Sequence, residues 1–566
     1  MASTVELPSI SPAPGDRRAG FRVRMSWGLL VAIALTVVIA APVAAVFAFV
    51  LQPSHGLWAH LVDTLLLAYL SNTALLGIGV GAATIVIGTG CAWLLVMYDF
   101  PGRRWLDWAM VLPLAMPAYV LAYAYTDFLQ FTGPVQTALR NAAGWGFQDY
   151  WFPPIHSVGG AIFVLSMALY PYVYVLARSA FIEQSVCALE VSRTLGCTAS
   201  AAFFRVALPL ARPAIAAGAG FVVMESLADF GAVKYFEVQT FTTGIYRAWF
   251  AQGNPAAASQ LASLLLLFVF AVLLLERRSR GHRRYAHTSA RYRELHPKRL
   301  SGWPAGFATL VCLLPLAFGF LIPAVVLFDM AANSSEPIRL ARLLHLIGNT
   351  VQIGLLASLL TVAAALLAIY AIKRDGRRLT RGLAHVALLG YATPGIVIAV
   401  GIVITIGAVD AAIAGVARTV FGVSTGLLLA GTIMAVLYGC LVRFFAVAFG
   451  PAEAGIGRIK RSFEDAARTL GTTPRGVLAR IHLPLMRGSV LSALLLVFVE
   501  VLKELPATMI LRPFNFDTLA TEAFQLATTE RLDGAAAPAL IIVAVGLAPV
   551  ILLCRTIRHS RPGRTV

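Results

Sequence analysis

The sequence predicts an all-α integral membrane protein with about twelve transmembrane helices, arranged as two homologous six-helix halves. Composition is the first observation behind this prediction: 59% of the 566 residues are hydrophobic and only 13% are charged. An ordinary soluble domain carries about 25% charged residues, so the composition indicates a multi-span membrane protein. The second observation is a basic, glycine-broken segment that occurs twice at a fixed spacing.

Apolar runs of about 20 residues are long enough to cross the roughly 30 Å hydrocarbon core of a bilayer. The chain contains such runs along its whole length, separated by short polar segments. We expect twelve spans, near residues 27–50, 72–97, 107–127, 158–177, 213–233, 258–275, 303–328, 350–372, 383–408, 425–448, 488–510 and 537–554.

Arginine and lysine predict the orientation, because basic residues are enriched in the cytoplasmic segments of membrane proteins. They gather in the N-terminal tail, in the turns FPGRRW and KRDGRR, in a central linker and in the C-terminal tail. With twelve spans all of these segments share one side, which we expect to be cytoplasmic, with both termini inside. The first apolar run is longer than a typical signal-peptide core, so we expect it to be a retained span.

The net charge of +18 does not indicate nucleic-acid binding, since the basic residues lie between apolar runs. We expect the linker arginines to contact anionic membrane lipid or to set the topology. The expected organisation is a cytoplasmic N-terminal tail (1–26), a first half (27–276), a basic cytoplasmic linker (277–302), a second half (303–555) and a cytoplasmic tail (556–566).

The repeated segment reads EVSRTLGCTASAAFFRVALPLARPAI at 190–215 and DAARTLGTTPRGVLARIHLPLMRGSV at 465–490. At an offset of 275, without gaps, ten of the 26 positions are identical. Further matches flank it: SNTALLGIGV with GNTVQIGLLA, LAMPAYVLA with YATPGIVIA, ESLADFGAV with EVLKELPAT, and Phe241 with Phe516. Two halves with an even number of spans each have the same topology, so a pseudo-twofold axis along the membrane normal should relate them, with the pathway between them.

Each copy predicts a helix, a turn and a second short helix. In the second copy Gly471 should end the first helix, and Thr473 followed by Pro474 should start a short amphipathic helix of roughly residues 474–481. Leu483-Pro484 is expected to end that helix, and the first copy follows the same plan. Such a helix could lie at the lipid interface, but the duplication favours docking on a partner that also comes in two copies.

These segments resemble the EAA loop of bacterial ABC importer permeases: an acid, two small residues, a glycine six residues after the acid, and Leu-Pro further on. Val191 and Ser192 replace the two small alanines of the pattern in the first copy, and Asp465 replaces glutamate in the second, with Glu464 one residue early. The resemblance implies a type I importer permease in which each loop forms a coupling helix seated on an ATPase subunit. The matching residues are Glu190, Gly196, Leu208 and Pro209 in the first half, and Asp465, Ala466, Ala467, Gly471, Leu483 and Pro484 in the second.

The whole chain also resembles the fused permeases of periplasmic iron(III) importers, notably in MESLADFGAVKYFEVQTFTTGIYRAWF and KELPATMILRPFNFDTLAT. This resemblance implies a subunit of the bacterial inner membrane that works with two copies of a cytoplasmic ABC ATPase and with a periplasmic substrate-binding protein. Thiamine, phosphonate, polyamine and sulfate importers share the architecture, so these cargoes remain alternatives.

Four acids within the spans are candidates for the translocation pathway, because intramembrane carboxylates are costly and are a functional hypothesis by default. Glu225 and Asp229 lie four residues apart, and Glu500 and Glu504 repeat the spacing. Carboxylate oxygens suit a hard cation such as Fe(III). A permeation path should not bind its cargo tightly, so no metal site is firmly assigned. Alternatively, the acids pair with Lys234 and Lys503 and hold helices together.

No catalytic residue is expected in this chain. The sequence has no GxxxxGK[ST] phosphate loop, no HExxH and no CxxC, and its six cysteines are scattered. We therefore expect no bound cofactor, with ATP and Mg²⁺ on a separate ATPase. The alternatives are a secondary transporter of the major-facilitator type, which lacks such duplicated segments, and a scaffold or channel without energy coupling.

Overall fold

The computed structural model describes residues 26–54, 56–146, 149–183, 194, 196, 198–280, 297–334 and 339–559. Almost all of them are helical. The first half contains α1 (Trp27–Phe49), α2 (Leu57–Thr64), α3 (Leu66–Met97), α4 (Arg103–Ala109), η1 (Leu112–Ala115), α5 (Ala118–Leu129), α6 (Pro134–Ala143), α7 (Val158–Glu183), α9 (Ala199–Ala202), η2 (Phe203–Ala207), α10 (Leu208–Ala228), α11 (Gly231–Tyr235), α12 (Phe241–Tyr246), η3 (Arg247–Ala251) and α13 (Pro255–Arg280).

The second half follows the same plan. It contains α14 (Trp303–Leu316), η4 (Ala317–Leu321), α15 (Ile322–Ala332), α16 (Leu340–Asp375), α17 (Arg378–Ala387), η5 (Leu388–Ala392), α18 (Gly395–Phe421), α19 (Ile433–Gly457), α20 (Arg461–Thr469), α21 (Pro474–Val477), η6 (Leu478–His482), α22 (Leu483–Leu502), α23 (Pro506–Leu511), α24 (Leu519–Thr528) and α25 (Leu532–His559). Two short strands, β1 (Tyr98–Asp99) and β2 (Lys298–Arg299), pair in parallel. Helix α13 continues to Arg280, past the predicted start of the linker.

The predicted count of twelve spans is not confirmed. Ten helices among the described residues are long and apolar enough to cross a membrane, or up to eleven if one bent pair is a single span. That pair corresponds to the predicted span 107–127, where the stretches Arg103–Ala115 and Ala118–Ala143 meet at 94°. The bend follows from Pro117, which caps α5 and holds Met116 in an extended conformation, as a residue before proline prefers. The predicted span 537–554 lies within α25, where the apolar stretch found is Leu532–Leu547 and most of the side chains beyond it lie outside the described part of the chain.

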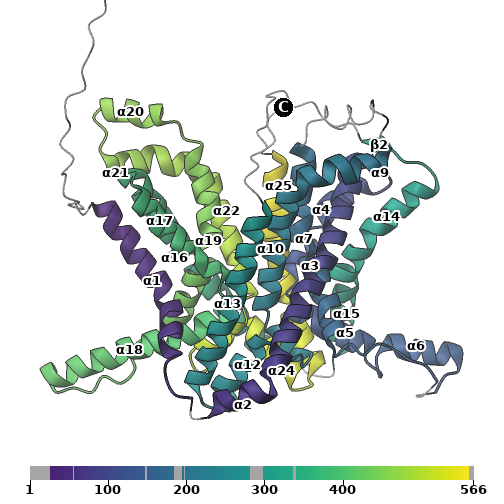
Figure 1. Cartoon of the computed structure of the whole chain (residues 1–566), viewed down its shortest axis with the longest axis horizontal. Helices are drawn as coiled ribbons and strands as arrows, with labels where there is room; N and C mark the ends of the chain where they lie inside the picture. The colour runs from purple at the N-terminus through teal and green to yellow at the C-terminus, as the bar shows by residue number, and fades with distance from the viewer. Residues whose placement is uncertain are drawn as a thin grey trace, which may run out of the picture.

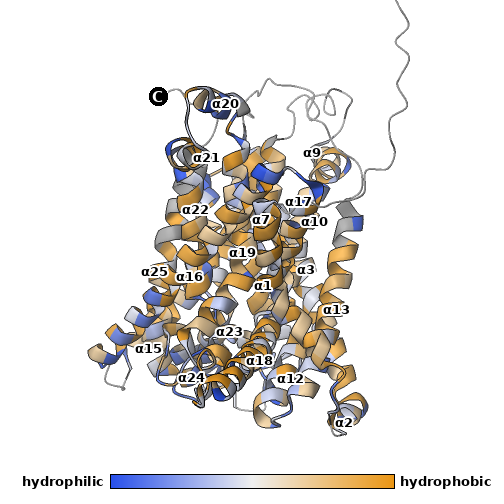
Figure 2. Cartoon of the chain, turned by 90° about the vertical axis from the view of Figure 1, so that its left-hand side faces the viewer, coloured by the Kyte–Doolittle hydropathy of each residue, from blue (hydrophilic) through white to orange (hydrophobic). Residues whose placement is uncertain are grey.

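Hydrophobic residues cover the middle of the long helices, and hydrophilic residues concentrate toward the ends (Figure 2). The elements of the two repeated segments, α20 and α21 in one half and α9 in the other, lie at the same end of the molecule and on opposite sides of it (Figure 1). Near the opposite end, α18 and α6 project to opposite sides. The repeat predicted from the sequence is therefore visible as an approximate twofold arrangement.

The first helix of each half packs against the other half. Helix α1 contacts α16, α17 and α18, while α14 and α15 contact α3, α4 and α5. Two hydrogen bonds to the second half fix α1: the Thr36 hydroxyl donates to Leu383 O over 2.9 Å, and the Tyr438 hydroxyl donates to Val38 O over 2.6 Å. The exchange of α1 and α14 joins the two halves through their apolar surfaces.

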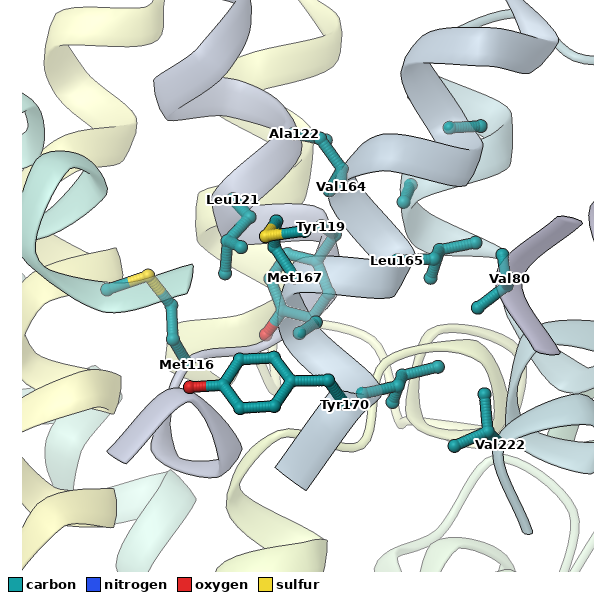
Figure 3. Packing of buried hydrophobic residues seen from close by; sticks show 14 of the residues in the cluster. Val80, Met116, Tyr119, Leu121, Ala122, Val164, Leu165, Met167, Tyr170 and Val222 are labelled. Carbon is teal, nitrogen blue, oxygen red and sulfur yellow. The ribbon is translucent and has the colours of Figure 1, made fainter. Parts of the chain in front are cut away.

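The larger hydrophobic core lies mainly among α3, α5, α7, α10 and α13. Figure 3 shows Val80, Leu165 and Val222, from three of these helices, converging within it. A second core joins α16, α18, α19 and α22, and Ile39 of α1 belongs to it. Two cores, one centred on each half, agree with the homology of the halves, because each half buries its own set of apolar side chains.

The same hydrogen bonds recur in the two halves. The amide of Asn72 donates to Gln239 O over 2.9 Å, and the amide of Asn349 donates to Asp517 O over the same distance. The hydroxyls of the following threonines accept from the first backbone N–H of α12 and of α24. Side chains of the long helices α3 and α16 therefore hold α12 and α24 in equivalent places.

The predicted pairing of Phe241 with Phe516 is wrong. Both α12 and α24 begin with a capping box, formed by Thr240 in one half and by Thr518 in the other. Phe241 is therefore the first residue of α12, whereas Phe516 lies before the cap of α24. The loop that precedes α24 is two residues longer than its counterpart and α23 is one residue longer than α11, so the offset of 275 does not extend this far.

Replacing Asn349 by leucine should lower the free energy of unfolding by about 1–2 kcal/mol, because it removes a buried side-chain hydrogen bond between two elements. Thermal unfolding of the purified protein in detergent measures this. Asn72→Leu should cost a similar amount, and Asn333→Leu, at an exposed position on α15's end, should cost much less. Equal losses at all three positions would contradict the repeated bond.

Candidate functional site

In each half, one helix connects the repeated segment with the intramembrane acids. Helix α10 starts directly after η2 and ends at Ala228, one residue before Asp229; α22 starts directly after η6 and ends at Leu502, two residues before Glu504. At 1.5 Å per residue, each helix is about 30 Å long. The repeated segments and the acids are therefore the two ends of the same rigid elements.

The second repeated segment has the predicted turn. Gly471 follows the end of α20 with φ +80°, a left-handed conformation that glycine adopts at little cost. The N–H groups of Gly471 and Thr472 donate to Arg468 O and Ala467 O, both over 3.0 Å, which is the Schellman pattern. The Thr473 hydroxyl then accepts from Gly476 N over 3.2 Å and caps α21. The predicted helix break and cap are confirmed.

The first repeated segment is described only in part. Glu190 lies outside the described residues. Gly196 has φ +85°, and the Thr198 hydroxyl accepts from Ala201 N over 3.3 Å, so the break and cap of the second copy recur here. Phe203 packs against Trp93 of α3 with ring centroids 4.8 Å apart, whereas Phe204 is 65% exposed.

The prediction that Leu-Pro ends the short helix is wrong. In both halves a five-residue π-helical turn, η2 or η6, continues without a break into the long helix. Leu208-Pro209 and Leu483-Pro484 are the first residues of α10 and α22. Proline is tolerated there because the wider turn moves the hydrogen bonding by one residue, with Leu483 N donating to Leu478 O.

The buried acid of the second repeated segment is Glu464 rather than Asp465. The Asp465 side chain is exposed, whereas Glu464 is buried against Lys373 of α16 and His482 of η6. His482 Nε2 lies 3.1 Å from Glu464 Oε1. Burial alone would raise the pKa of the Glu464 carboxyl, but its bonds to Lys373 and His482 hold that pKa below its usual value. Three elements therefore meet at one carboxylate.

The four intramembrane acids line a single cavity of about 90 Å³ between the halves. Its other walls come from η1, α5, α7 and the loop after α10. The cavity thus brings together Glu225, Asp229, Glu500 and Glu504, as the repeated spacing predicted, with Arg443, Lys503, Tyr119 and Tyr172 among the remaining lining residues.

Ion pairs connect most of these charges. Arg443 of α19 places Nη1 at 3.2 Å from Glu504 Oε2 and Nη2 at 3.7 Å from Glu225 Oε1. Lys503 Nζ lies 2.9 Å from Glu500 Oε1, which confirms one of the predicted internal pairs. Lys234 is exposed and takes part in none of the ion pairs found among the described residues.

Sequence reasoning missed Arg443 and the contacts of Glu464. Arg443 had a signal, since a buried arginine within an apolar span is functional by default, but it has no counterpart in the first half. At the offset of 275 the equivalents of Arg443 and Lys503 are Ala168 and Ala228, and both alanines line the same cavity. The acids are therefore repeated and the bases are not.

No group of three or more His, Cys, Asp or Glu side chains within the described residues is arranged to hold a metal ion. The carboxylates of the cavity are engaged with arginine, lysine or backbone N–H groups instead: Asp229 Oδ2 accepts from Val233 N over 3.0 Å, and Glu504 Oε1 accepts from Ala507 N over the same distance. Among the described residues the cavity is therefore a polar pocket rather than a preformed metal cage.

A model of the family described as "Binding-protein-dependent transport system inner membrane component" matches the chain twice, at residues 84–281 and 361–559. The chain belongs to this family. It is a multi-pass permease of a binding-protein-dependent transport system, and the double match is the repeat that the two halves show. Membership also sets aside the major-facilitator alternative.

Relatives that span most of the chain are named as ferric permeases. The "Fe(3+)-transport system permease protein FbpB 2" of Haemophilus influenzae is 26% identical over 467 residues, covering 82% of this chain and 84% of that protein. The "Ferric transport system permease protein FbpB" of Actinobacillus pleuropneumoniae is 24% identical over 78% of this chain and 64% of its own length. The "Molybdenum transport system permease protein ModB" of Escherichia coli is 28% identical over 190 residues, 32% of this chain.

Glu464→Gln should loosen the second repeated segment, because it leaves Lys373 and His482 without their shared carboxylate. We expect backbone amides of α20 to exchange hydrogen at least about tenfold faster, equivalent to about 1.4 kcal/mol of local stability. Hydrogen exchange with mass spectrometry measures this. Asp465→Asn is the matched control and should leave the exchange unchanged, since that side chain is exposed; equal acceleration in both variants would contradict the assignment.

The same contact should depend on pH. Because the folded-state pKa of Glu464 is lowered, the contact stabilises the segment at pH values above the usual glutamate pKa of about 4.3. That stabilisation is lost as the pH falls through the lower, folded-state pKa. Exchange in α20 of the wild-type chain should therefore approach that of Glu464→Gln at low pH, and a constant ratio at all pH values would argue against this.

Proposed function

We propose that this chain is the membrane-spanning subunit of an ATP-driven importer that carries iron(III) from the periplasm to the cytoplasm. The observation that carries the proposal is the pair of helices α10 and α22, which join the two repeated segments to a cavity of four carboxylates. Movement imposed at the segments would reach the cavity through these helices. The chain itself needs no cofactor and performs no catalysis; ATP and Mg²⁺ bind the partner.

The partners follow from the twofold plan. Two copies of a cytoplasmic ABC ATPase would each receive one segment at the residues named above, and a periplasmic binding protein would deliver the cargo at the opposite end. Exposed apolar side chains on the segments support docking, with Phe204 at 65% and Leu470 at 85% exposure. Both termini and the basic linker would then be cytoplasmic, in contact with anionic lipid of the inner membrane.

Iron is the cargo that the charges of the cavity favour. Four carboxylates face two basic side chains, and carboxylate oxygens are ligands that a hard cation prefers. Oxyanions such as molybdate or phosphonate would meet repulsion from the uncompensated acids. Relatives named as ferric permeases cover most of the chain, and the molybdenum relative covers about a third of it.

Uptake of radiolabelled Fe(III) by iron-starved cells, with and without this chain, tests the cargo. We expect uptake to be lost without the chain and to resist competition by molybdate, thiamine and phosphonate. Undiminished uptake without the chain, in cells that have no parallel iron importer, would reject iron as the cargo while leaving the importer class standing.

Replacing both Gly196 and Gly471 by valine should uncouple ATP hydrolysis from transport. A β-branched residue at φ near +80° costs about 1–2 kcal/mol at each turn and would misplace the short helices. We expect at least a tenfold fall in uptake while the protein still inserts and binds lipid. Gly376→Val, which strains a left-handed turn after α16 outside both segments, is the matched control; normal uptake in the double variant would oppose the coupling role.

A further inference from the structure

Arg443 is the one side chain of the cavity that forms ion pairs with acids of both halves, within the part of the chain that the structure describes. Its Nη2 lies 3.7 Å from Glu225 of the first half, and its Nη1 lies 3.2 Å from Glu504 of the second. The arginine side chain is 10% exposed and the Glu504 side chain 4%, whereas the Glu225 side chain is 33% exposed.

The cavity carries more negative than positive charge. Against Arg443 and Lys503 stand four carboxylates, which leaves a formal excess of two negative charges. Among the ion pairs of the described residues none includes Asp229. In addition, the Tyr119 hydroxyl is buried without a hydrogen-bond partner, and Tyr119 lines the same cavity. Asp229 accepts from the backbone N–H of Val233 but has no cationic partner, and the Tyr119 hydroxyl has no partner at all, so together with the excess negative charge they point to a missing cationic occupant.

A glycine beside Arg443 leaves the space that its guanidinium occupies. Gly395, the first residue of α18, packs directly on it: a Cβ at this position would lie 2.1 Å from Arg443 Nη1 and 2.9 Å from Glu504 Oε1. In the matched motif of the first half, LAMPAYVLA, the equivalent residue is Ala118, and the equivalent of Arg443 is Ala168. The glycine and the arginine therefore occur together, in one half only.

We propose that Arg443 is a tethered substitute for the cargo, and that a multivalent metal cation passing through the cavity displaces its guanidinium from between the carboxylates of the two halves. The inference rests on the proposed function only in taking the cargo to be a cation. In the empty protein Arg443 supplies the compensating charge that the buried acids need. When the cation arrives, the Glu225 and Glu504 carboxylates that Arg443 releases become its ligands, with Asp229 and Tyr119 lining the same cavity.

The arrangement explains how four carboxylates avoid trapping the cargo. Favourable binding must be weak enough for the ion to leave. A guanidinium attached to α19 competes for the same oxygens at every moment, so its return favours release of the cation. The asymmetry between the halves follows, because a single tethered cation is enough for a single cavity.

Equilibrium binding of radiolabelled Fe(III), supplied as its nitrilotriacetate complex, tests the proposal. The sample is the complete permease–ATPase complex in lipid nanodiscs, without the binding protein, so that docking does not contribute. We expect weak binding by the wild-type complex and binding at least about tenfold tighter in Arg443→Gln, which removes the competitor. Arg443→Lys keeps a tethered cation and should stay near the wild-type affinity.

A second variant keeps the test valid if Arg443→Gln does not fold. Gly395→Ala retains every charge but pushes the flexible end of Arg443 away from Glu504, and it should tighten Fe(III) binding about threefold or more. Gly407→Ala, on the same helix with nothing within 4 Å of the added Cβ, is the matched control and should not change binding. Unchanged or weaker Fe(III) binding in both Arg443→Gln and Gly395→Ala would overturn the proposal.

Binding of molybdate, an anionic probe, tests the opposite possibility, that the cavity binds an anion. If Arg443 were a ligand for an oxyanion, the wild-type complex would bind molybdate and Arg443→Gln would lose that binding, which would also overturn the proposal. Failure of the proposed function looks different: the wild-type importer would not take up Fe(III) into vesicles, yet Arg443→Gln would still bind Fe(III) more tightly. Cargo identity and the role of Arg443 are therefore tested separately.

Discussion

Charge compensation inside the membrane is the constraint on which the rest of this structure depends. Carboxylates within spans are tolerated only when they are paired or face a polar passage, and here the acids of both halves meet one guanidinium. Because Arg443 reaches Glu225 in one direction and Glu504 in the other, it fixes how α10, α19 and α22 come together. The exchange of α1 and α14 between the halves joins the two apolar cores, one centred on each half.

The helices that carry the acids also carry the repeated segments, so a movement of a segment can be transmitted to the acids. A π-helical turn, rather than a break, precedes each Leu-Pro, so the hydrogen-bonded backbone continues from the short helix into the long helix. Glu464, Lys373 and His482 attach the second repeated segment to α16. Displacement of a segment would therefore move the acids of the cavity, about 30 Å away, without requiring any flexible linker in between.

Local sequence patterns predicted those features of the structure whose geometry depends on a few neighbouring residues. Glycines at φ near +80° and threonine caps were recognised because their geometry is set within a few residues. The four intramembrane acids were predicted because the same four-residue spacing between two acids occurs in both halves of the sequence. Arg443 was missed since it has no repeated partner and its acids lie on other helices, far away in the chain. The bend at Pro117 and the shifted partner of Phe241 were missed for related reasons, since hydropathy does not report bends and a loop can lengthen without changing the helices around it.

The most direct test of coupled movement is the distance between spin labels at Arg212 of α10 and Arg487 of α22, two exposed and equivalent positions within the repeated segments. The labels would be attached to cysteines at these positions in a chain whose native cysteines have been replaced, reconstituted with its ATPase. Trapping the ATPase with bound ATP should shorten the distance by several ångströms relative to the nucleotide-free complex. An unchanged distance distribution, in a complex that still hydrolyses ATP and imports its cargo, would contradict the account.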